Sequence, residues 1–264
     1  MSKISKQINS KKHKSEIKKL SFKNSLQNVC KKYPNLADRI IKSLKVPQLS
    51  DFHSEGPKMD SHLRLMLDNV ISIYNGDYDD SLIDILEKVI CIPDLNNSEE
   101  LIVNPDIIDY IFLHDSAKPD CLSLKTDINN EQEITWDQWR EIEKNGPPFK
   151  FNNQIISAIS YCHSSEGIDG NHGKKAANQL ECSGISSSLL LVISKHEAAC
   201  QFGQISAKTF KKLFTGKGYT PKLREFILAV SYIDMMATVG INGNPNMTNY
   251  FNLIKSKEEY EKSL

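Results

Sequence analysis

Apolar residues recur at intervals of three and four along most of this chain, a spacing typical of helices with one buried face. The clearest case covers residues 59–74. Met66, Val70 and Ile73 would lie on one face of that helix. The same pattern predicts further helices over 20–32, 36–44, 80–90, 106–114, 136–146, 152–163, 172–181, 186–196, 206–214, 221–239 and 249–262.

One segment alternates between apolar and polar positions instead. Cys121, Leu122 and Leu124 precede a polar turn. Ile134 and Trp136 follow that turn, so we expect a β-hairpin here. With 12 glycines and 10 prolines among 264 residues, the chain has few of the turns that an all-β protein needs. The predicted fold class is therefore all-α, a helical bundle with a small β-hairpin insertion.

Charge divides the chain near residue 46. Residues 1–46 carry a net charge of +11, from 12 lysines and one arginine against one glutamate and one aspartate, whereas the whole chain is neutral. We predict a basic N-terminal extension over 1–46, partly disordered or helical, and a helical domain over 47–264. The extension could contact nucleic acid or an anionic membrane. A solvated leader is the alternative, because no aromatic residue before Phe22 offers a stacking platform for bases.

Several classes of protein are excluded by composition. No apolar run approaches the roughly 18 residues that a membrane-spanning helix needs. The first residues also lack the apolar stretch of a secretory signal. The six cysteines are far apart and form no CxxC pair, which favours reduced thiols over a disulfide framework or a zinc finger. We therefore expect a cytoplasmic protein without a transmembrane segment.

The strongest chemical signal is the doublet His114-Asp115, which ends the apolar run 107–113. An imidazole and a carboxylate on consecutive residues can bind one divalent cation where a helix end meets a cavity. Lys118 follows about one helical turn after His114 and adds a positive charge on the same side. Such a set suits metal-assisted attack on a phosphate ester. The alternative interpretation is a polar cap on a surface helix.

Three further histidines and one aspartate stand at comparable positions. His62 lies near the start of a predicted helix, His172 begins one, and His196 ends one. Asp234 lies inside an otherwise apolar helix, where an unpaired carboxylate is costly and a bound cation is one partner. Each has a structural alternative: a backbone partner for His62, a helix cap for His196, and a lysine or N–H partner for Asp234.

The order of these residues resembles that of the HD-domain superfamily of metal-dependent phosphohydrolases. HDSAKP resembles the family's HD-x-G-K-P segment. HSEG followed by His62 resembles the lead-in of HD domains of the bacterial tRNA CCA-adding enzyme and polynucleotide kinase types. GNHGKKAANQL, SKHEAACQF and SYIDMMATVG resemble the segments that carry two later histidines and the closing aspartate. The resemblance covers about residues 48–240, and it departs from the family at Ala117, where glycine is usual.

The resemblance implies an HD-type helical bundle that holds one or two divalent ions, of Mn, Ni, Fe, Mg or Zn. The implied ligands are His62, His114, Asp115 and Asp234 for a first ion, and Asp115, His172 and His196 for a second. The segment between the doublet and His172 is long, and His163 within it competes with His172 as a ligand. We prefer His172 because the small residues around it suit a helix start.

The resemblance also implies which residues act on a substrate. Asp115 and Lys118 are the implied catalytic residues, and Lys118 is also an implied substrate-binding residue. Glu55 and His53 are implied either to bind the substrate or to support the metal ligands from behind. For Glu55, an ordinary loop carboxylate is the favoured alternative to a catalytic role. The expected function is that of a phosphatase or phosphodiesterase acting on a nucleotide or another phosphate ester, with metal-activated water attacking phosphorus. The alternatives are a non-catalytic nucleotide- or nucleic-acid-binding module with a degenerate pocket, and an interaction protein whose pocket only stabilises the bundle.

Overall fold

The computed structural model describes residues 20–49, 53–76, 83–98, 101–126, 131–163, 171–216, 218–245 and 247–264. The α-helices are α2 (Phe22–Lys32), α3 (Ala37–Ser43), α4 (Met59–Asn75), α5 (Ile83–Ile90), α6 (Pro105–Leu113), α7 (Trp136–Lys144), α8 (His172–Leu180), α9 (Ser187–Lys195), α10 (Ala207–Phe214), α11 (Pro221–Ala237) and α12 (Thr248–Lys262). Short 3-10 helices are η1 (Pro34–Leu36), η3 (Lys118–Asp120) and η5 (His196–Gln201). The strands are β1 (Cys91–Pro93), β2 (Leu101–Val103), β3 (Ser123–Thr126), β4 (Gln132–Glu133), β5 (Lys150–Phe151) and β6 (Gln154–Ser160).

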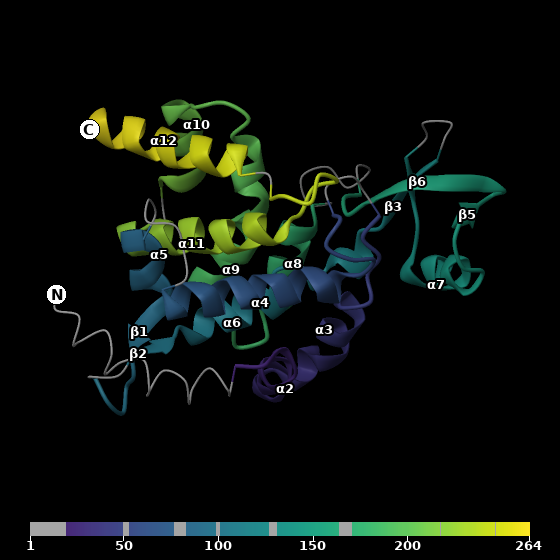
Figure 1. Cartoon of the computed structure of the whole chain (residues 1–264), viewed down its shortest axis with the longest axis horizontal. Helices are drawn as coiled ribbons and strands as arrows, with labels where there is room; N and C mark the ends of the chain where they lie inside the picture. The colour runs from purple at the N-terminus through teal and green to yellow at the C-terminus, as the bar shows by residue number, and fades with distance from the viewer. Residues whose placement is uncertain are drawn as a thin grey trace.

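The centre of the molecule is a layered group of helices, shown in Figure 1. In it, α11 packs against α4, α5 and α9, while α6 packs against α4 and α9. The pair α10 and α12 lies on one side of this group, and α2 and α3 lie on the other (Figure 1). Several chain segments that are far apart in sequence thus meet along the inner faces of α4, α6, α9 and α11.

The helix α6 shows why these segments bury so completely. Asn104 caps its first turn by accepting a hydrogen bond from the N–H of Asp106, and Pro105 suits the first helical position. Tyr110, Ile111 and neighbouring apolar side chains are fully buried. Full burial of each large apolar side chain contributes about 1.5–3 kcal/mol. The helix therefore fixes the position of whatever follows it, which is the His114-Asp115 doublet.

The N-terminal segment is described only in part. Residues 1–19 of the predicted basic extension lie outside the described residues. Residues 20–46 include α2 and α3, whose Val29 and Ile40 are buried in the same core as α6. The boundary predicted at residue 46 and the nucleic-acid contact of the extension stay predictions.

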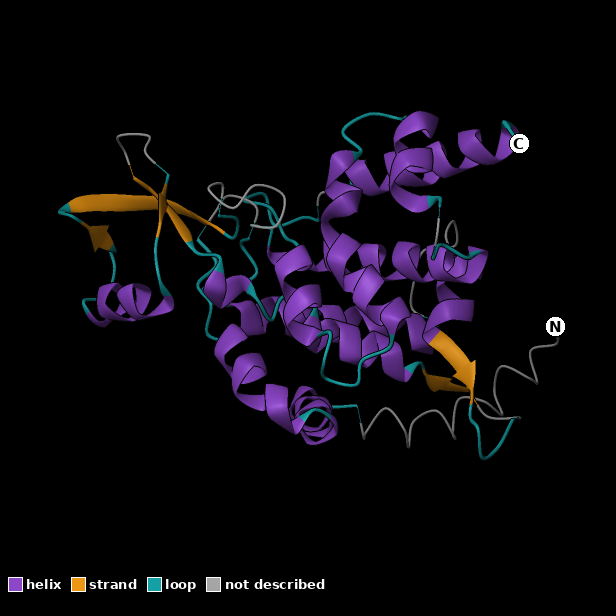
Figure 2. Ribbon diagram, turned by 180° about the vertical axis from the view of Figure 1, so that it is seen from behind, coloured by secondary structure: helices purple, strands orange, loops and turns teal. Residues whose placement is uncertain are grey.

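The predicted all-α class is wrong, because the part of the chain that the structure describes combines helices with two antiparallel sheets. The larger sheet has four strands in the order β4-β3-β6-β5, and the smaller pairs β1 with β2. Figure 2 shows the larger sheet and α7 on one side of the helical body. The predicted hairpin is confirmed by the pairing of β3 with β4, but it is the smaller part of this sheet.

The helix predicted over 152–163 is also wrong, because these residues include strand β6. Its apolar positions, Ile156 and Ile159, are buried and lie on the face that packs inward. Ile159 pairs with Leu124 of β3, which is fully buried. β-Branched residues favour strands when a partner strand is present, and the short apolar run did not distinguish the two periods. The paired strands β3 and β6 leave Lys118 and Tyr161 at the base of the sheet, next to the helical body.

Among the helices that the structure describes, none combines the length and the apolar character needed to cross a bilayer.

Candidate metal centre

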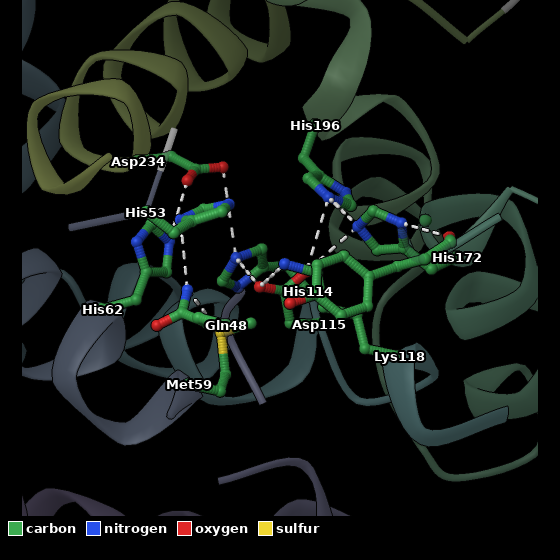
Figure 3. Close-up of polar contacts among 12 residues, drawn as sticks. Gln48, His53, Met59, His62, His114, Asp115, Lys118, His172, His196 and Asp234 are labelled. Carbon is green, nitrogen blue, oxygen red and sulfur yellow. Dashed lines mark hydrogen bonds and ion pairs between the residues drawn. The ribbon is translucent and has the colours of Figure 1, made fainter. Parts of the chain in front are cut away.

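Six side chains predicted as metal ligands converge from separate helices, as Figure 3 shows. Each of them lies at or near the end of a helix. The positions are His62 in the first turns of α4, His114 and Asp115 directly after α6, His172 at the start of α8, His196 directly after α9, and Asp234 in the last turn of α11. The structure thus brings together residues that span 173 positions of the chain, from 62 to 234.

The first group of ligand atoms is a triad of His62, His114 and Asp234. Nε2 of His62 lies 3.0 Å from Oδ1 of Asp234, and Nε2 of His114 lies 4.0 Å from Oδ2 of the same carboxylate. The three ligand atoms all lie within 4.8 Å of one another. Each oxygen of Asp234 therefore faces a different imidazole, with room for one ion among them.

The second group is a triad of Asp115, His172 and His196. Oδ1 of Asp115 lies 3.1 Å from Nε2 of His172 and 3.7 Å from Nε2 of His196. The two imidazole nitrogens are 3.0 Å apart. The other oxygen of Asp115, Oδ2, lies 3.1 Å from Nε2 of His114 in the first triad. Asp115 therefore stands between the triads with one oxygen toward each, as a carboxylate shared by two ions would.

Backbone carbonyls orient all four histidines in the same way. Each ring directs its Nδ1 to a carbonyl oxygen and leaves its Nε2 toward the centre. The Nδ1–oxygen distances are 3.2 Å for His62 to Ala237, 3.1 Å for His114 to Tyr110, 3.0 Å for His172 to Tyr161 and 2.8 Å for His196 to Ile193. Because a carbonyl can only accept, each Nδ1 carries the proton. This is the arrangement by which proteins fix the tautomer of metal-binding histidines.

The resulting centre has an excess of acceptors. Asp115 and the four imidazoles are at most 6% exposed. Both oxygens of Asp115 and Nε2 of His114 lie close to nitrogen atoms but make no hydrogen bond of good geometry among the described residues. Buried acceptors that face one another are costly unless a cation lies between them. The donor set, four neutral nitrogens and two carboxylates, fits one or two divalent ions.

In the metal-free chain, protons on the histidines supply part of the positive charge that the buried acceptors need. Burial opposes a charge on His62, but hydrogen bonds to Asp234 and Glu55 outweigh it and raise the pKa of His62 to about 9. Burial lowers the pKa of His196, and the neighbouring His172 and His114 lower it further, to about 4. The centre therefore holds a proton on His62 and an uncharged imidazole at His196. A metal that bound to the first triad would have to displace the proton on Nε2 of His62.

The carboxylates of the centre are held ionised. Burial alone would raise the pKa of Asp115, but the charges of His114 and Lys118 outweigh it and hold that pKa well below its usual value. Burial also opposes ionisation of Asp234, and the hydrogen bond from His62 and the charge of His114 again prevail, so its pKa is strongly lowered. Both side chains are thus available as anionic ligands at neutral pH.

A cavity of about 420 Å³ opens beside the triads. Its walls combine metal-ligand side chains with residues that sequence reasoning missed. The lining residues are His53, His62, Asp115, Lys118, Tyr161, His172, His196, Glu197, Cys200, Asp234, Met235, Thr238 and Asn249. Lys118 places its ammonium 2.9 Å from Oδ2 of Asp115 and 4.5 Å from the ring centre of Tyr161. Of these missed residues, only Glu197 could have been suspected from the sequence, because it directly follows His196.

The predicted substrate-side residues His53 and Glu55 form a pair. Nδ1 of His53 lies 2.7 Å from Oε1 of Glu55. His53 lines the cavity, whereas the side chain of Glu55 is fully buried behind it and lies 3.4 Å from Nδ1 of His62. Burial would raise the pKa of Glu55, but its hydrogen bonds with His53 and His62 lower it to about 2. Glu55 therefore orients two histidines and does not face the cavity.

The alternative ligand His163 lies outside both triads. Its Nε2 is 3.2 Å from the carbonyl oxygen of Leu122, and its Nδ1 is 4.0 Å from Oε2 of Glu133. His172 occupies the place for which the two histidines competed, since its Nε2 faces both Asp115 and His196.

Comparison of the chain with protein-family models, with curated proteins and with solved structures finds no match. The resemblance to HD-domain proteins therefore rests on the motifs and on their order alone.

Proposed function

We propose that the protein is a metal-dependent phosphohydrolase that acts on a nucleotide or another phosphate ester. The observation that carries this proposal is the pair of adjacent triads on either side of Asp115, with Lys118 at the edge of the cavity that both triads face. Paired metal sites beside a cation are the recurrent arrangement for hydrolysis of phosphate esters. A purely structural role would leave the ammonium of Lys118 to compensate a buried carboxylate whose oxygens make no hydrogen bond of good geometry among the described residues.

The donor set favours particular metals. Four imidazole nitrogens and two carboxylates suit Mn²⁺, Fe²⁺, Ni²⁺ or Zn²⁺, whereas Mg²⁺ prefers oxygen ligands. His62, His114 and Asp234 would hold one ion, His172 and His196 would hold the other, and Asp115 would be shared between them. Bound ions of this kind lower the pKa of a water molecule and neutralise phosphoryl oxygens.

The chain's own residues would do the rest. Lys118, as a flexible point charge on the cavity wall, would contact a phosphoryl oxygen and offset the negative charge that develops on it. His53 faces the cavity, and Glu55 fixes its ring by accepting from Nδ1–H, so its Nε2 would be left to accept a hydrogen bond from a hydroxyl of the substrate. The backbone carbonyls behind the four ligand histidines keep the centre in one geometry before substrate binds.

The test is hydrolysis of a phosphomonoester and phosphodiester panel by the full chain loaded with Mn²⁺ or Ni²⁺. We expect one metal-dependent activity on the panel, and Asp115→Asn should reduce it at least a hundredfold. Asp68→Asn, on an exposed face of α4, is the matched control and should leave activity unchanged. Activity that survives Asp115→Asn at full strength contradicts the proposal, as does a metal-loaded protein that is inactive on the whole panel.

A further inference from the structure

We propose that the cavity selects phosphate esters with a single phosphoryl group, and that Glu197 is the residue that disfavours diphosphates and triphosphates. This inference rests on the proposed phosphohydrolase function and names the substrate class of that site. It rests on the balance of charge on the cavity wall. Hydrolysis of a phosphate ester does not itself depend on that balance.

The cavity is poor in cationic side chains. Among its described lining residues, Lys118 is the single lysine or arginine, and its ammonium is already paired with Asp115 at 2.9 Å. Sites that bind polyphosphates use several cationic groups. The described wall of this cavity offers one.

Glu197 adds a fixed negative charge to the wall. It lines the cavity beside the second triad, and 35% of its side chain is exposed, so an approaching anion meets its carboxylate. The side-chain amide of Asn171 donates a hydrogen bond to Oε2 of Glu197, and Oε1 lies 3.4 Å from Nδ1 of His172. Asn171 is itself fixed, because its Oδ1 accepts from the N–H of Gly173 at 3.0 Å. Glu197 therefore cannot easily swing away from a second phosphate.

The charges favour one phosphoryl group. Two divalent ions would bring four positive charges and Lys118 one more, whereas Asp115, Asp234, Glu197 and the ionised Glu55 behind His53 would remove four. The remaining charge of about +1 does not exceed the charge of one dianionic phosphoryl group. Each further phosphate would therefore add uncompensated negative charge and would be repelled by the carboxylate of Glu197.

The remainder of the wall is neutral and suits the organic part of the ester. Tyr161, Met235, Thr238 and Asn249 contribute an aromatic ring, a thioether, a hydroxyl and an amide. A cavity of about 420 Å³ falls within the common range of small-molecule sites, roughly 300–1,000 Å³. The expected substrate is therefore a phosphate monoester of an uncharged organic alcohol.

The first test measures binding without turnover. The full chain is loaded with Mn²⁺, freed of excess metal, and titrated calorimetrically with inorganic phosphate and with pyrophosphate, and its metal content is checked afterwards. We expect phosphate to bind at least tenfold more tightly. Glu197→Gln, which keeps an acceptor for Asn171, should narrow that ratio at least fivefold, while Glu181→Gln at the exposed end of α8 should not. Equal binding of the two anions by the wild type overturns the proposal, and an unchanged ratio in Glu197→Gln overturns the role of Glu197.

Salt gives a second measurement that needs no variant. Because the discrimination is a repulsion between charges, raising the ionic strength should shrink the phosphate-to-pyrophosphate ratio in the wild type. A ratio that is independent of salt contradicts the electrostatic cause.

Hydrolysis separates this inference from the proposed function. The same metal-loaded protein is assayed with a nucleoside monophosphate and the corresponding diphosphate, and kcat/KM is expected to be at least tenfold higher for the monophosphate. If both are hydrolysed equally, the function stands and the selectivity fails. If no ester is hydrolysed while the binding ratio holds, the selectivity of the cavity stands and the enzymatic proposal fails.

Discussion

His172 and His196 place their Nε2 atoms 3.0 Å apart, although they are 24 residues apart in the chain and belong to different elements. Two imidazoles in this position share one proton or one cation. The approach depends on Gly173, since a Cβ added there would lie 2.7 Å from Cε1 and 2.8 Å from Nδ1 of His196. The absence of a side chain at position 173 thus allows α8 to pack against the end of α9 and to complete the second triad.

Replacing this glycine should open the second triad. Alanine in a helix interior is normally favoured over glycine by about 1 kcal/mol. Here we expect Gly173→Ala to destabilise the chain by about 1–3 kcal/mol, because backbone and ring must shift to admit the methyl group. Metal content should fall by up to one equivalent per chain. Urea unfolding and elemental analysis measure the two effects.

Gly203→Ala is the control for this substitution, because a Cβ there meets nothing within 4 Å. It should leave both metal content and stability close to those of the wild type. A Gly173→Ala protein with full metal content would show that His196 does not need its present position.

Metal binding should stabilise the fold, and Asp115 should be needed for most of that stabilisation. A ligand that binds only the folded state adds about 2.7 kcal/mol when its free concentration is a hundredfold above Kd. We therefore expect Mn²⁺ to raise the thermal midpoint of the chelator-treated protein in a concentration-dependent way. Asp115→Asn should lose more than half of that rise, since one oxygen of Asp115 faces each triad. Asp68→Asn should keep it, and an equal rise in all three proteins would mean that the ions bind elsewhere.

The metal-free protein should become less stable as pH rises past neutrality, because His62 loses its proton. Its pKa is about 9 when folded, against an ordinary value of 6.5, so the stability that it contributes is complete below pH 6.5 and disappears as pH rises through 9. Its partner Asp234 has a lowered pKa, and the stability that it contributes is present above pH 3.8 and is lost only as pH falls below that value. The pair therefore contributes fully between these two limits.

The measurement is urea unfolding of the wild type and of His62→Gln from pH 6 to pH 9.5, both in the presence of a chelator. The difference in the free energy of unfolding should shrink steadily across this range. A constant difference would indicate that His62 is uncharged in the folded protein. Addition of metal at pH 7 should release protons, which calorimetry in buffers of different ionisation enthalpy detects.

The sequence predicted most helices because their apolar faces are continuous. Helices α6 and α11 lie within a residue or two of the predicted ranges, and Pro221 begins α11 as its preference for the first turn suggests. Strand β6 was missed because Ile155, Ile156 and Ile159 form a short run that fits either period. Its conformation depends on pairing with β3, more than 28 residues earlier, and local spacing holds no information about that partner.

The candidate ligands could be named from the sequence because their motifs and order resemble those of HD-domain proteins, and because the His114-Asp115 doublet and Asp234 are polar residues next to or within apolar helices, where burial is costly. Their arrangement was not visible. The orientation of each imidazole depends on a carbonyl that packing brings to it, as Ala237 does for His62 across 175 positions. The sequence likewise left two roles open for Glu55, and only the folded structure shows that its side chain lies behind His53 and away from the cavity. Close contact between α8 and α9 likewise places Glu197 on the cavity wall.

Lys118 should lower metal affinity while supporting turnover. Its ammonium lies 2.9 Å from Oδ2 of Asp115 and is only slightly exposed, so it competes with an ion for that oxygen in the resting protein. Lys118→Met, similar in length and uncharged, should therefore bind Mn²⁺ more tightly than the wild type. Without the point charge toward the phosphoryl group, kcat should fall by about 10²–10³-fold, the usual effect of removing one group that stabilises developing charge. Metal titration and steady-state kinetics measure the two effects, and Lys125→Met, at the exposed position of strand β3, is the control. Weaker metal binding in Lys118→Met would show that the lysine supports the ligand set, and an unchanged kcat would remove it from the reaction.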